Sequence, residues 1–195
     1  MTTPVEVLDF WLGEIGPDGW YAGGEDLDDE CRARFGDLVE AAAGEGLDHW
    51  VSGPAGALAF LLLTDQLPRN IHRGTAQAFA ADPAARQAAR RAIDQGWDLD
   101  VPEPERQFFY LPFEHSEDPA DQDLSVSLIA ERLPEMPESL LHARAHREII
   151  ARFGRFPFRN TALGRDSTEA ETEFLSQGGY AAAVEELRAQ DGQGA

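Results

Sequence analysis

Signals for the start and end of helices recur along the whole chain, and they constrain its fold more than any other feature. Proline at a first helical position and glycine just past a last one are typical of helix boundaries. Stretches of alternating apolar and polar residues, typical of strands, do not occur. The sequence therefore predicts an all-α fold of about eight to ten helices in stacked antiparallel pairs. The predicted helices run from about Pro4 to Leu12, Leu27 to Ala43, Ala55 to Leu67, Pro83 to Gly96, Pro104 to Tyr110, Pro119 to Arg132, Glu138 to Phe153, Thr168 onward, and Tyr180 to Arg188.

The predicted helix from Ala55 to Leu67 is apolar nearly all round, which indicates that it is the central buried helix. We expect Pro68 to end it, because the residue before a proline is pushed out of the helical region. Near the N-terminus, the stretch GEIGPDGWYAGGED is rich in glycine and proline and predicts a loop.

Three further boundaries rest on capping residues. Asp82 is predicted to cap the helix that begins at Pro83. Thr168, followed three residues later by Glu171, fits a capping box. Gly154 is expected to end the helix before it, because glycine readily adopts the left-handed conformation of a helix stop.

The charged residues restrict the chemistry. The chain has 36 Asp and Glu against 16 arginines and no lysine, which gives a net charge of -20. Lysine chemistry such as a Schiff base is therefore excluded. We expect no nucleic-acid or membrane partner, because so negative a field repels phosphates and anionic lipids. Cys31, the single cysteine, cannot form an internal disulfide, and its acidic neighbours disfavour the thiolate.

The length of 195 residues predicts one domain over residues 1–190, followed by a frayed tail at residues 191–195. No secretory signal is visible at the N-terminus. The longest apolar run, Ala57 to Leu63, is far shorter than the roughly 20 residues that span a bilayer. We expect a cytoplasmic protein without a cofactor; the oligomeric state stays open.

The first candidate site is the segment DQLPRN and the arginine beyond it. Asp65 continues the apolar stripe of the buried helix, where a carboxylate is costly unless it is paired. One interpretation is that an arginine folds back onto Asp65 and stabilises the turn. The other is that the turn presents its polar side chains to an anionic ligand. The residues concerned are Asp65, Gln66, Arg69, Asn70 and Arg73.

The second candidate site is the segment RFGRFPFRN. Glu148 and Arg152 have the spacing of an ion pair on a helix surface. Arg155 and Arg159 lie beyond the helix without a local acid, so we expect distant partners, for which Asp65 or Glu114 could serve. Asn160 follows and could orient a ligand.

The third candidate site is the loop FEHSE. His115 could act as a general acid or base, with Glu114 orienting it. The structural interpretation is that Ser116 or Asp118 caps the helix beginning at Pro119 and that Glu114 pairs with an arginine.

His142 and His146 are spaced four residues apart, as metal ligands on a helix can be. They lie in an apolar stripe without the glutamate of an HExxH motif. We therefore favour packed or hydrogen-bonded histidines and predict no metal, with His142 and His146 as weak candidates.

Three blocks of the sequence, DQLPRNIHRGTAQAFAADP, FFYLPFEHSED and HREIIARFGRFPFRNTALGRDST, resemble the bacterial and fungal family called domain of unknown function 924. The resemblance extends from VLDFWLG almost to FLSQGGY. It implies an all-helical, tetratricopeptide-like fold and no established activity. Histidine is common in the family where this chain has Phe158, so a function that needs that histidine would be absent here. The matching positions are Asp65, Gln66, Pro68, Arg69, Asn70, Arg73, Glu114, His115, Ser116, His146, Arg152, Phe153, Gly154, Arg155, Pro157, Arg159 and Asn160.

Two functions follow as hypotheses. In the first, both arginine segments and the FEHSE loop form a pocket for a small carboxylate or phosphate compound, with His115 and Glu114 as tentative catalytic residues. In the second, a helical-repeat-like groove binds a protein or peptide, and the polar cluster is a structural ion-pair network.

Overall fold

The computed structural model describes residues 3–44 and 46–193, and within them the chain is helical with no strand. About three quarters of the chain, 75%, is helix, so the prediction of an all-α fold is confirmed. The chain divides into two compact units, unit 1 up to Pro112 and unit 2 from Phe113. Whether these make up one folding domain, as the length suggests, stays a prediction.

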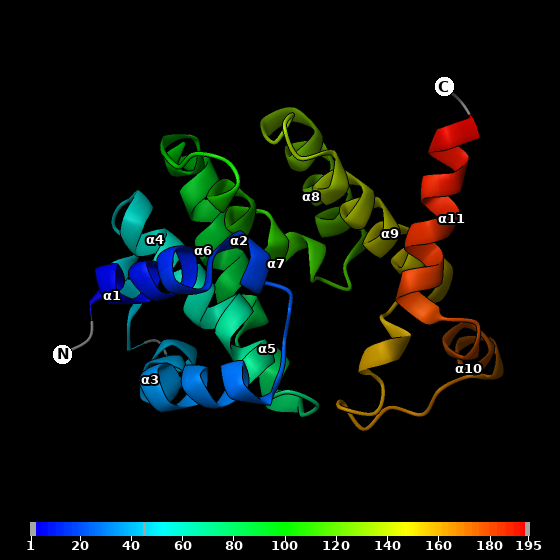
Figure 1. Cartoon of the computed structure of the whole chain (residues 1–195), viewed down its shortest axis with the longest axis horizontal. Coiled ribbons are helices and arrows are strands. Elements are labelled where there is room, and N and C mark those ends of the chain that lie inside the picture. The colour runs from blue at the N-terminus through cyan, green and yellow to red at the C-terminus, as the bar shows by residue number, and fades with distance from the viewer. Residues whose placement is uncertain (1–2, 45, 194–195) are drawn as a thin grey trace. The chain divides into compact units, whose positions relative to one another are not determined.

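Unit 1 is built around the apolar helix that the sequence singles out. Residues Ala57 to Leu63 are all buried, and α4 packs against α1 and α6. Its helices appear in blue to green (Figure 1). They are α1 (Pro4–Leu8), η1 (Asp9–Ile15), α2 (Gly16–Gly19), α3 (Glu25–Ala43), η2 (Asp48–Trp50), α4 (Pro54–Leu61), η3 (Leu62–Gln66), α5 (Leu67–Ile71), η4 (Ala76–Phe79), α6 (Asp82–Asp94), η5 (Trp97–Asp100), η6 (Glu105–Phe109) and the first residues of α7 (Leu111–Glu114).

The prediction that Pro68 ends the buried helix is wrong. A π-helical segment, η3, precedes the proline, and the helical path continues through α5 to Ile71. The Leu67 N–H donates to the carbonyl of Leu62, five residues back. This wider turn accommodates a proline, which has no N–H to donate and would clash with the turn before it in a regular α-helix.

Two other boundaries differ from the prediction. The first helical path does not end near Leu12 but continues as the π-helical η1 to Ile15 and then as α2 to Gly19. Since α3 begins at Glu25, only residues 20–24 of the predicted loop GEIGPDGWYAGGED lie outside helices. Asp82 is not the N-cap of α6, whose N-cap is Ala81 without a side-chain hydrogen bond. The carboxylate of Asp82 accepts hydrogen bonds from Arg69.

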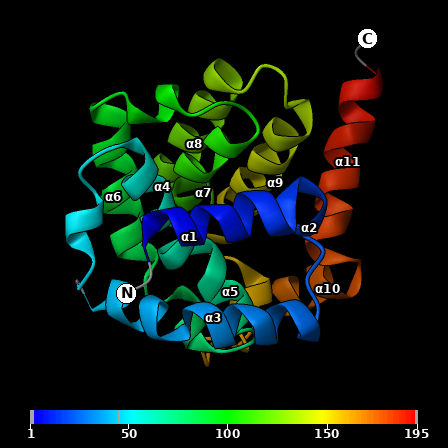
Figure 2. The ribbon, with the colours of Figure 1, turned by 60° about the vertical axis from the view of Figure 1, so that its left-hand side comes forward.

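Unit 2 is a set of packed helices: α8 (Pro119–Arg132), α9 (Pro137–Phe153), η7 (Pro157–Arg159), α10 (Glu169–Ser176) and α11 (Gly179–Gln193). The long helix α9 packs against both α8 and α11, and the three lie side by side (Figure 2). One core joins Ile149, Ile150 and Phe156 to Phe174 of α10. The described part of the predicted tail, residues 191–193, continues α11, and residues 194–195 lie outside the described residues.

The caps predicted for unit 2 are confirmed. Asp118 accepts a hydrogen bond from the Ala120 N–H at the start of α8. Gly154 ends α9 with a φ of 69°, a conformation that favours glycine. The side chains of Thr168 and Glu171 form both hydrogen bonds of a capping box at α10.

A glycine in α4 gives a test of the packing in unit 1. A Cβ on Gly56 would lie 2.1 Å from the Trp50 carbonyl oxygen, a backbone atom that cannot rotate away. We expect Gly56→Ala to lower the free energy of unfolding by about 1–3 kcal/mol, as overpacking does. Gly36→Ala in α3 is the control, because its Cβ would meet nothing nearer than Arg32 Cγ at 4.0 Å. It should raise the free energy of unfolding by about 0.5–1 kcal/mol. Urea unfolding measures both, and equal stability of the two variants would contradict the packing.

Candidate functional site

The first arginine segment, in unit 1, is an internal ion-pair cluster around Asp65. The Asp65 side chain is 1% exposed, and Gln66 Nε2 donates to its Oδ2 at 2.6 Å. Arg69 Nη2 lies 3.3 Å from Asp65 Oδ1 and 3.1 Å from Asp82 Oδ1. Arg69 also donates to the Asp65 carbonyl. The interpretation that an arginine folds back onto Asp65 is confirmed.

Arg73 belongs to the same segment but pairs with a different helix. Its Nε and Nη2 donate to the carboxylate of Asp28 in α3 at 2.6 and 2.7 Å, and Nη2 also donates to Asn70 Oδ1 at 2.9 Å. The hydrogen bonds to Asp28 raise the pKa of Arg73 above its ordinary value. These contacts tie α5 to α3.

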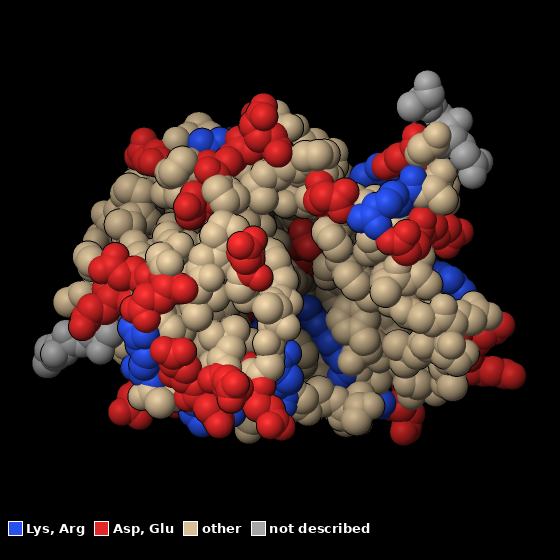
Figure 3. Space-filling view, viewed as in Figure 1, with Lys and Arg blue, Asp and Glu red and all other residues tan. Residues whose placement is uncertain are grey.

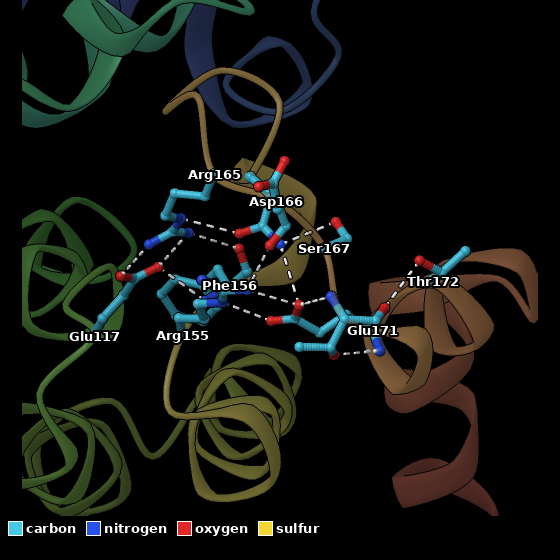
Figure 4. Close-up of polar contacts among 10 residues, drawn as sticks. Glu117, Arg155, Phe156, Arg165, Asp166, Ser167, Glu171 and Thr172 are labelled. Carbon is cyan, nitrogen blue, oxygen red and sulfur yellow. Dashed lines mark hydrogen bonds and ion pairs between the residues drawn. The ribbon is translucent and has the colours of Figure 1, made fainter.

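In unit 2, Arg155 also makes a two-pronged ion pair, but not with either of the acids expected from the sequence. Its Nε and Nη2 donate to the carboxylate of Glu171 at 2.6 and 2.8 Å, and Nη2 donates to the Asp166 carbonyl at 2.9 Å (Figure 4). The Arg155 hydrogen bond lowers the pKa of Glu171 from its ordinary 4.5 to about 2, helped by the Thr168 N–H.

A second pair completes this network, and sequence reasoning missed its acid. Arg165 donates to both oxygens of Glu117 at 2.7 and 3.0 Å, and Glu117 accepts the Phe156 N–H at 2.8 Å. Burial raises the pKa of Glu117, but the hydrogen bonds from Arg165 and Phe156 outweigh it, and the pKa falls below its ordinary value. Asn160 links the two pairs, accepting from Arg165 Nε and donating toward Glu171.

We call these five residues, Glu117, Arg155, Asn160, Arg165 and Glu171, the turn network. It holds the chain between α9 and α10 in place. Each of the two guanidinium groups already binds both oxygens of one carboxylate with two of its nitrogens, so these donors serve the fold. Figure 4 shows the contacts converging on this turn.

The other two arginines of the segment lie against aromatic rings. Arg159 is 7% exposed; its guanidinium carbon lies 4.5 Å from the centre of the Phe156 ring, and its Nη1 donates to the His115 carbonyl at 3.0 Å. Arg152, expected to pair with Glu148, stacks on Phe153 and Phe174 at 4.7 and 5.6 Å. The structure thus brings Arg159, but not Arg152, to the FEHSE loop.

The FEHSE loop is fixed by the backbone contacts of a buried glutamine. Gln122 of α8 is fully buried, and its Nε2 donates to the carbonyls of Glu114 and Ser116, both at 2.6 Å. Ser116 Oγ donates to Asp121 at 2.8 Å. These bonds, with the Asp118 cap, determine where Glu114 and His115 lie.

Glu114 lies against His146 of α9, a partner that the sequence did not predict. Its carboxylate is 5% exposed, and Oε1 is 3.0 Å from His146 Nδ1. The same nitrogen is 3.0 Å from the His142 carbonyl, which can only accept. Nδ1 therefore carries a proton, and whenever the ring is neutral Nε2 is the nitrogen that has the lone pair.

Rings surround this pair. His146 lies 6.1 Å from His115 and 4.8 Å from Tyr180 between ring centres, and His142 Nδ1 is 2.6 Å from Tyr180 Oη. Burial lowers the pKa of His142. We call Glu114, His115, His142, His146 and Tyr180 the histidine cluster. Both α9 histidines are hydrogen-bonded and half-buried, as expected from the sequence.

Phe158 lies beside the histidine cluster, where the resemblance suggests that relatives carry histidine. The residue is 42% exposed, and its ring centre lies 5.2 Å from that of Phe156 and 6.2 Å from that of Tyr180. Within residues 3–44 and 46–193, no three His, Cys, Asp or Glu side chains are placed to hold a metal ion.

Helix α3 of unit 1 is strongly acidic, and it carries many exposed charged side chains. Acidic side chains gather over α3, with arginines among them (Figure 3). Cys31 of this helix is buried, and burial raises the pKa of its thiol to about 12, with Asp28 and Glu30 adding to the shift.

None of the described helices is long and apolar enough to cross a membrane.

Comparison with known proteins gives a family and a structural neighbour. A family model described as "Bacterial protein of unknown function (DUF924)" matches residues 7–179. A protein of unknown function from Agrobacterium tumefaciens, ATU0120, has a solved structure that is 44% identical in sequence, with a TM-score of 0.84. The match covers 89% of this chain and 97% of that one. The search of curated proteins found no match.

The turn network predicts how acid affects stability. The pKa of Glu171 is lowered in the folded state, so its contribution is present above 4.5 and is lost as the pH falls from 4.5 toward about 2. Glu171→Gln keeps a side chain that fits a capping box but cannot carry the charge. We expect the variant to be less stable than the parent near neutral pH, with the difference shrinking across that acid range. Urea unfolding at a series of pH values measures it.

Glu173→Gln is the matched control, because Glu173 lies on the same helix, is exposed and accepts a hydrogen bond from the neutral Gln177. The difference in free energy of unfolding between this control and the parent should change little with pH. A stability difference for Glu171→Gln that stays constant from neutral pH to about 2 would contradict the assignment.

Proposed function

Because the chain belongs to the family described as "Bacterial protein of unknown function (DUF924)", whose description names no activity, we propose a function from the site itself. The protein binds a small anionic compound, a carboxylate or a phosphate, at the histidine cluster of unit 2. His146 is its acid–base group and Glu114 holds that group in place.

The contact between Glu114 and His146 carries this proposal. A carboxylate that is 5% exposed is costly to bury, and here its oxygen lies 3.0 Å from the Nδ1 of an imidazole. This arrangement fixes the ring and leaves Nε2 to accept a proton, which is how a carboxylate supports a general-base histidine. Where the bound compound reacts, Nε2 of His146 moves the proton. His115, the acid–base residue suggested by the sequence, is in this proposal only a ring beside His146.

The positive charge for the anion comes from the arginine beside the cluster. Arg159 contacts the His115 carbonyl and the Phe156 ring, and His146 lies against the same ring, with ring centres 5.4 Å apart. A guanidinium suits a carboxylate or phosphate because its planar donors can bind two oxygens together. Arg155 and Asn160 have a structural part in the turn network. That the unit 1 residues Asp65 to Arg73 join the site stays a prediction.

A second candidate function is a helical module that binds a protein or peptide partner. The ion pairs that the arginines make within the fold favour it. Arg155 and Arg165 each bind a carboxylate with two nitrogens, which is what a structural ion-pair network requires. On this interpretation, the polar residues fix the helices and recognition happens elsewhere on the surface.

One variant separates the two functions. In His146→Asn, the amide nitrogen takes roughly the place of Nδ1 and can still donate to Glu114, while Nε2 is removed. Phosphate, acetate and succinate are titrated at constant ionic strength, and the histidine ring signals are followed by NMR together with the melting temperature. We expect one class of anion to shift the His146 and His115 signals and raise the melting temperature of the parent. In the variant, the same anion should leave the His115 signals and the melting temperature unchanged.

Arg155→Gln is the companion variant, because it breaks the turn network without touching the histidine cluster. It should lower the melting temperature and leave the anion response in place. The proposal is wrong if no anion affects the parent, or if His146→Asn responds as the parent does.

A further inference from the structure

A hollow of about 340 Å³ lies on unit 2, and none of the residues of the turn network or the histidine cluster lines it. It is bounded by α9 and α11, with the end of α10 closing one side. Its apolar wall includes Ile149, Phe174, Ala183 and Leu187. Its size is at the lower end of the range of small-molecule pockets, about 300–1,000 Å³.

Arg152 is the cation of this hollow, and it differs from its neighbours in what it contacts. Its guanidinium carbon lies 4.7 Å from the Phe153 ring centre and 5.6 Å from that of Phe174, so the group is held by ring faces. Among the described residues it makes no ion pair. Six other arginines of unit 2 lie within 4 Å of a carboxylate oxygen: Arg132, Arg144, Arg147, Arg155, Arg165 and Arg188.

Two acids line the same hollow and are likewise unpaired within the described part of the chain. Glu148, one turn before Arg152 on α9, has the spacing of a surface ion pair but does not approach the guanidinium within ion-pair distance. Glu186 lies across from them on α11. The hollow therefore presents one cation and two anions beside an apolar wall.

We propose that this hollow binds a free α-amino acid with an apolar or aromatic side chain. The ligand carboxylate is received by the stacked guanidinium of Arg152, whose planar donors can bind both oxygens. The ammonium group lies toward Glu148 and Glu186, and the side chain covers the wall of Ile149, Phe174 and Leu187. A single phosphate or a dicarboxylate fits less well, because the two glutamates repel a second negative charge.

The site shares no residue with the histidine cluster, so it does not rest on the function proposed above. Loss of anion binding in His146→Asn leaves this site intact, and loss of amino-acid binding at Arg152 leaves that function intact.

Calorimetric titration of the full chain with four compounds tests the proposal. L-Phenylalanine and L-leucine carry both charges, phenylpropionate lacks the ammonium, and phenylethylamine lacks the carboxylate. We expect the amino acids to bind and each single-charge analogue to bind about tenfold more weakly or worse, because a hydrogen bond to a charged group contributes at least that much.

Arg152→Met retains an apolar stem against the rings without the charge, and it should weaken amino-acid binding about tenfold or more. Arg147→Met is the matched control on the same helix, since Arg147 faces Asp123 at 3.6 Å and does not line the hollow. The double variant Glu148→Gln and Glu186→Gln changes exposed side chains only. It should weaken L-phenylalanine binding and leave phenylpropionate unaffected or stronger.

Three results would overturn the proposal. The first is no binding of either amino acid at millimolar concentration. The second is equal binding by the parent and Arg152→Met. The third is phenylpropionate binding as tightly as L-phenylalanine, which would mean that the ammonium is not recognised.

Discussion

The pairing of arginine with buried carboxylate is the interaction on which both units depend. The chain has no lysine, and acids outnumber the arginines by more than two to one, so a carboxylate held in the interior has few cationic partners available. Asp65 is joined to Arg69, and Glu171 to Arg155, each in a contact that also fixes the backbone around it. Replacing one partner leaves a buried charge alone, which is costlier than losing the pair together.

Local signals in the sequence predicted the caps and stops of helices better than they predicted whether one helical segment continues into the next. The capping box at Thr168 and the glycine stop at Gly154 are confirmed, because each depends on residues within one turn of the chain. Pro68 misled for a different reason: the rule that proline ends a helix assumes regular α-helical hydrogen bonds. The π-helical turn before Pro68 has no strong local signal, and the packing around it outweighs the propensity of its residues.

In the candidate site, too, the sequence predicted local features better than contacts between distant residues. The sequence identified Arg155, Glu114 and His146 as residues of interest but assigned the wrong partners to two of them. Arg155 meets Glu171, sixteen residues onward, and Glu114 meets His146 from another helix. Which acid meets which base depends on how α9 lies against its neighbours, and helical periodicity does not encode that. One clue was present: Glu171, already required by the capping box, had a second oxygen to offer.

The distribution of partners is also the reason that we propose the histidine cluster, and not the arginine turn, as the place for chemistry. An arginine already bound by two carboxylate oxygens has given its best donors to the fold. If a ligand took the place of that carboxylate, the protein's own acid would remain a buried charge without a partner, which is costly. His146 is different, since its contacts with Glu114 and the His142 carbonyl use one nitrogen and leave the other to accept a proton. In the proposed function, Arg155 and Arg165 therefore serve the fold, and His146 is the group that moves a proton.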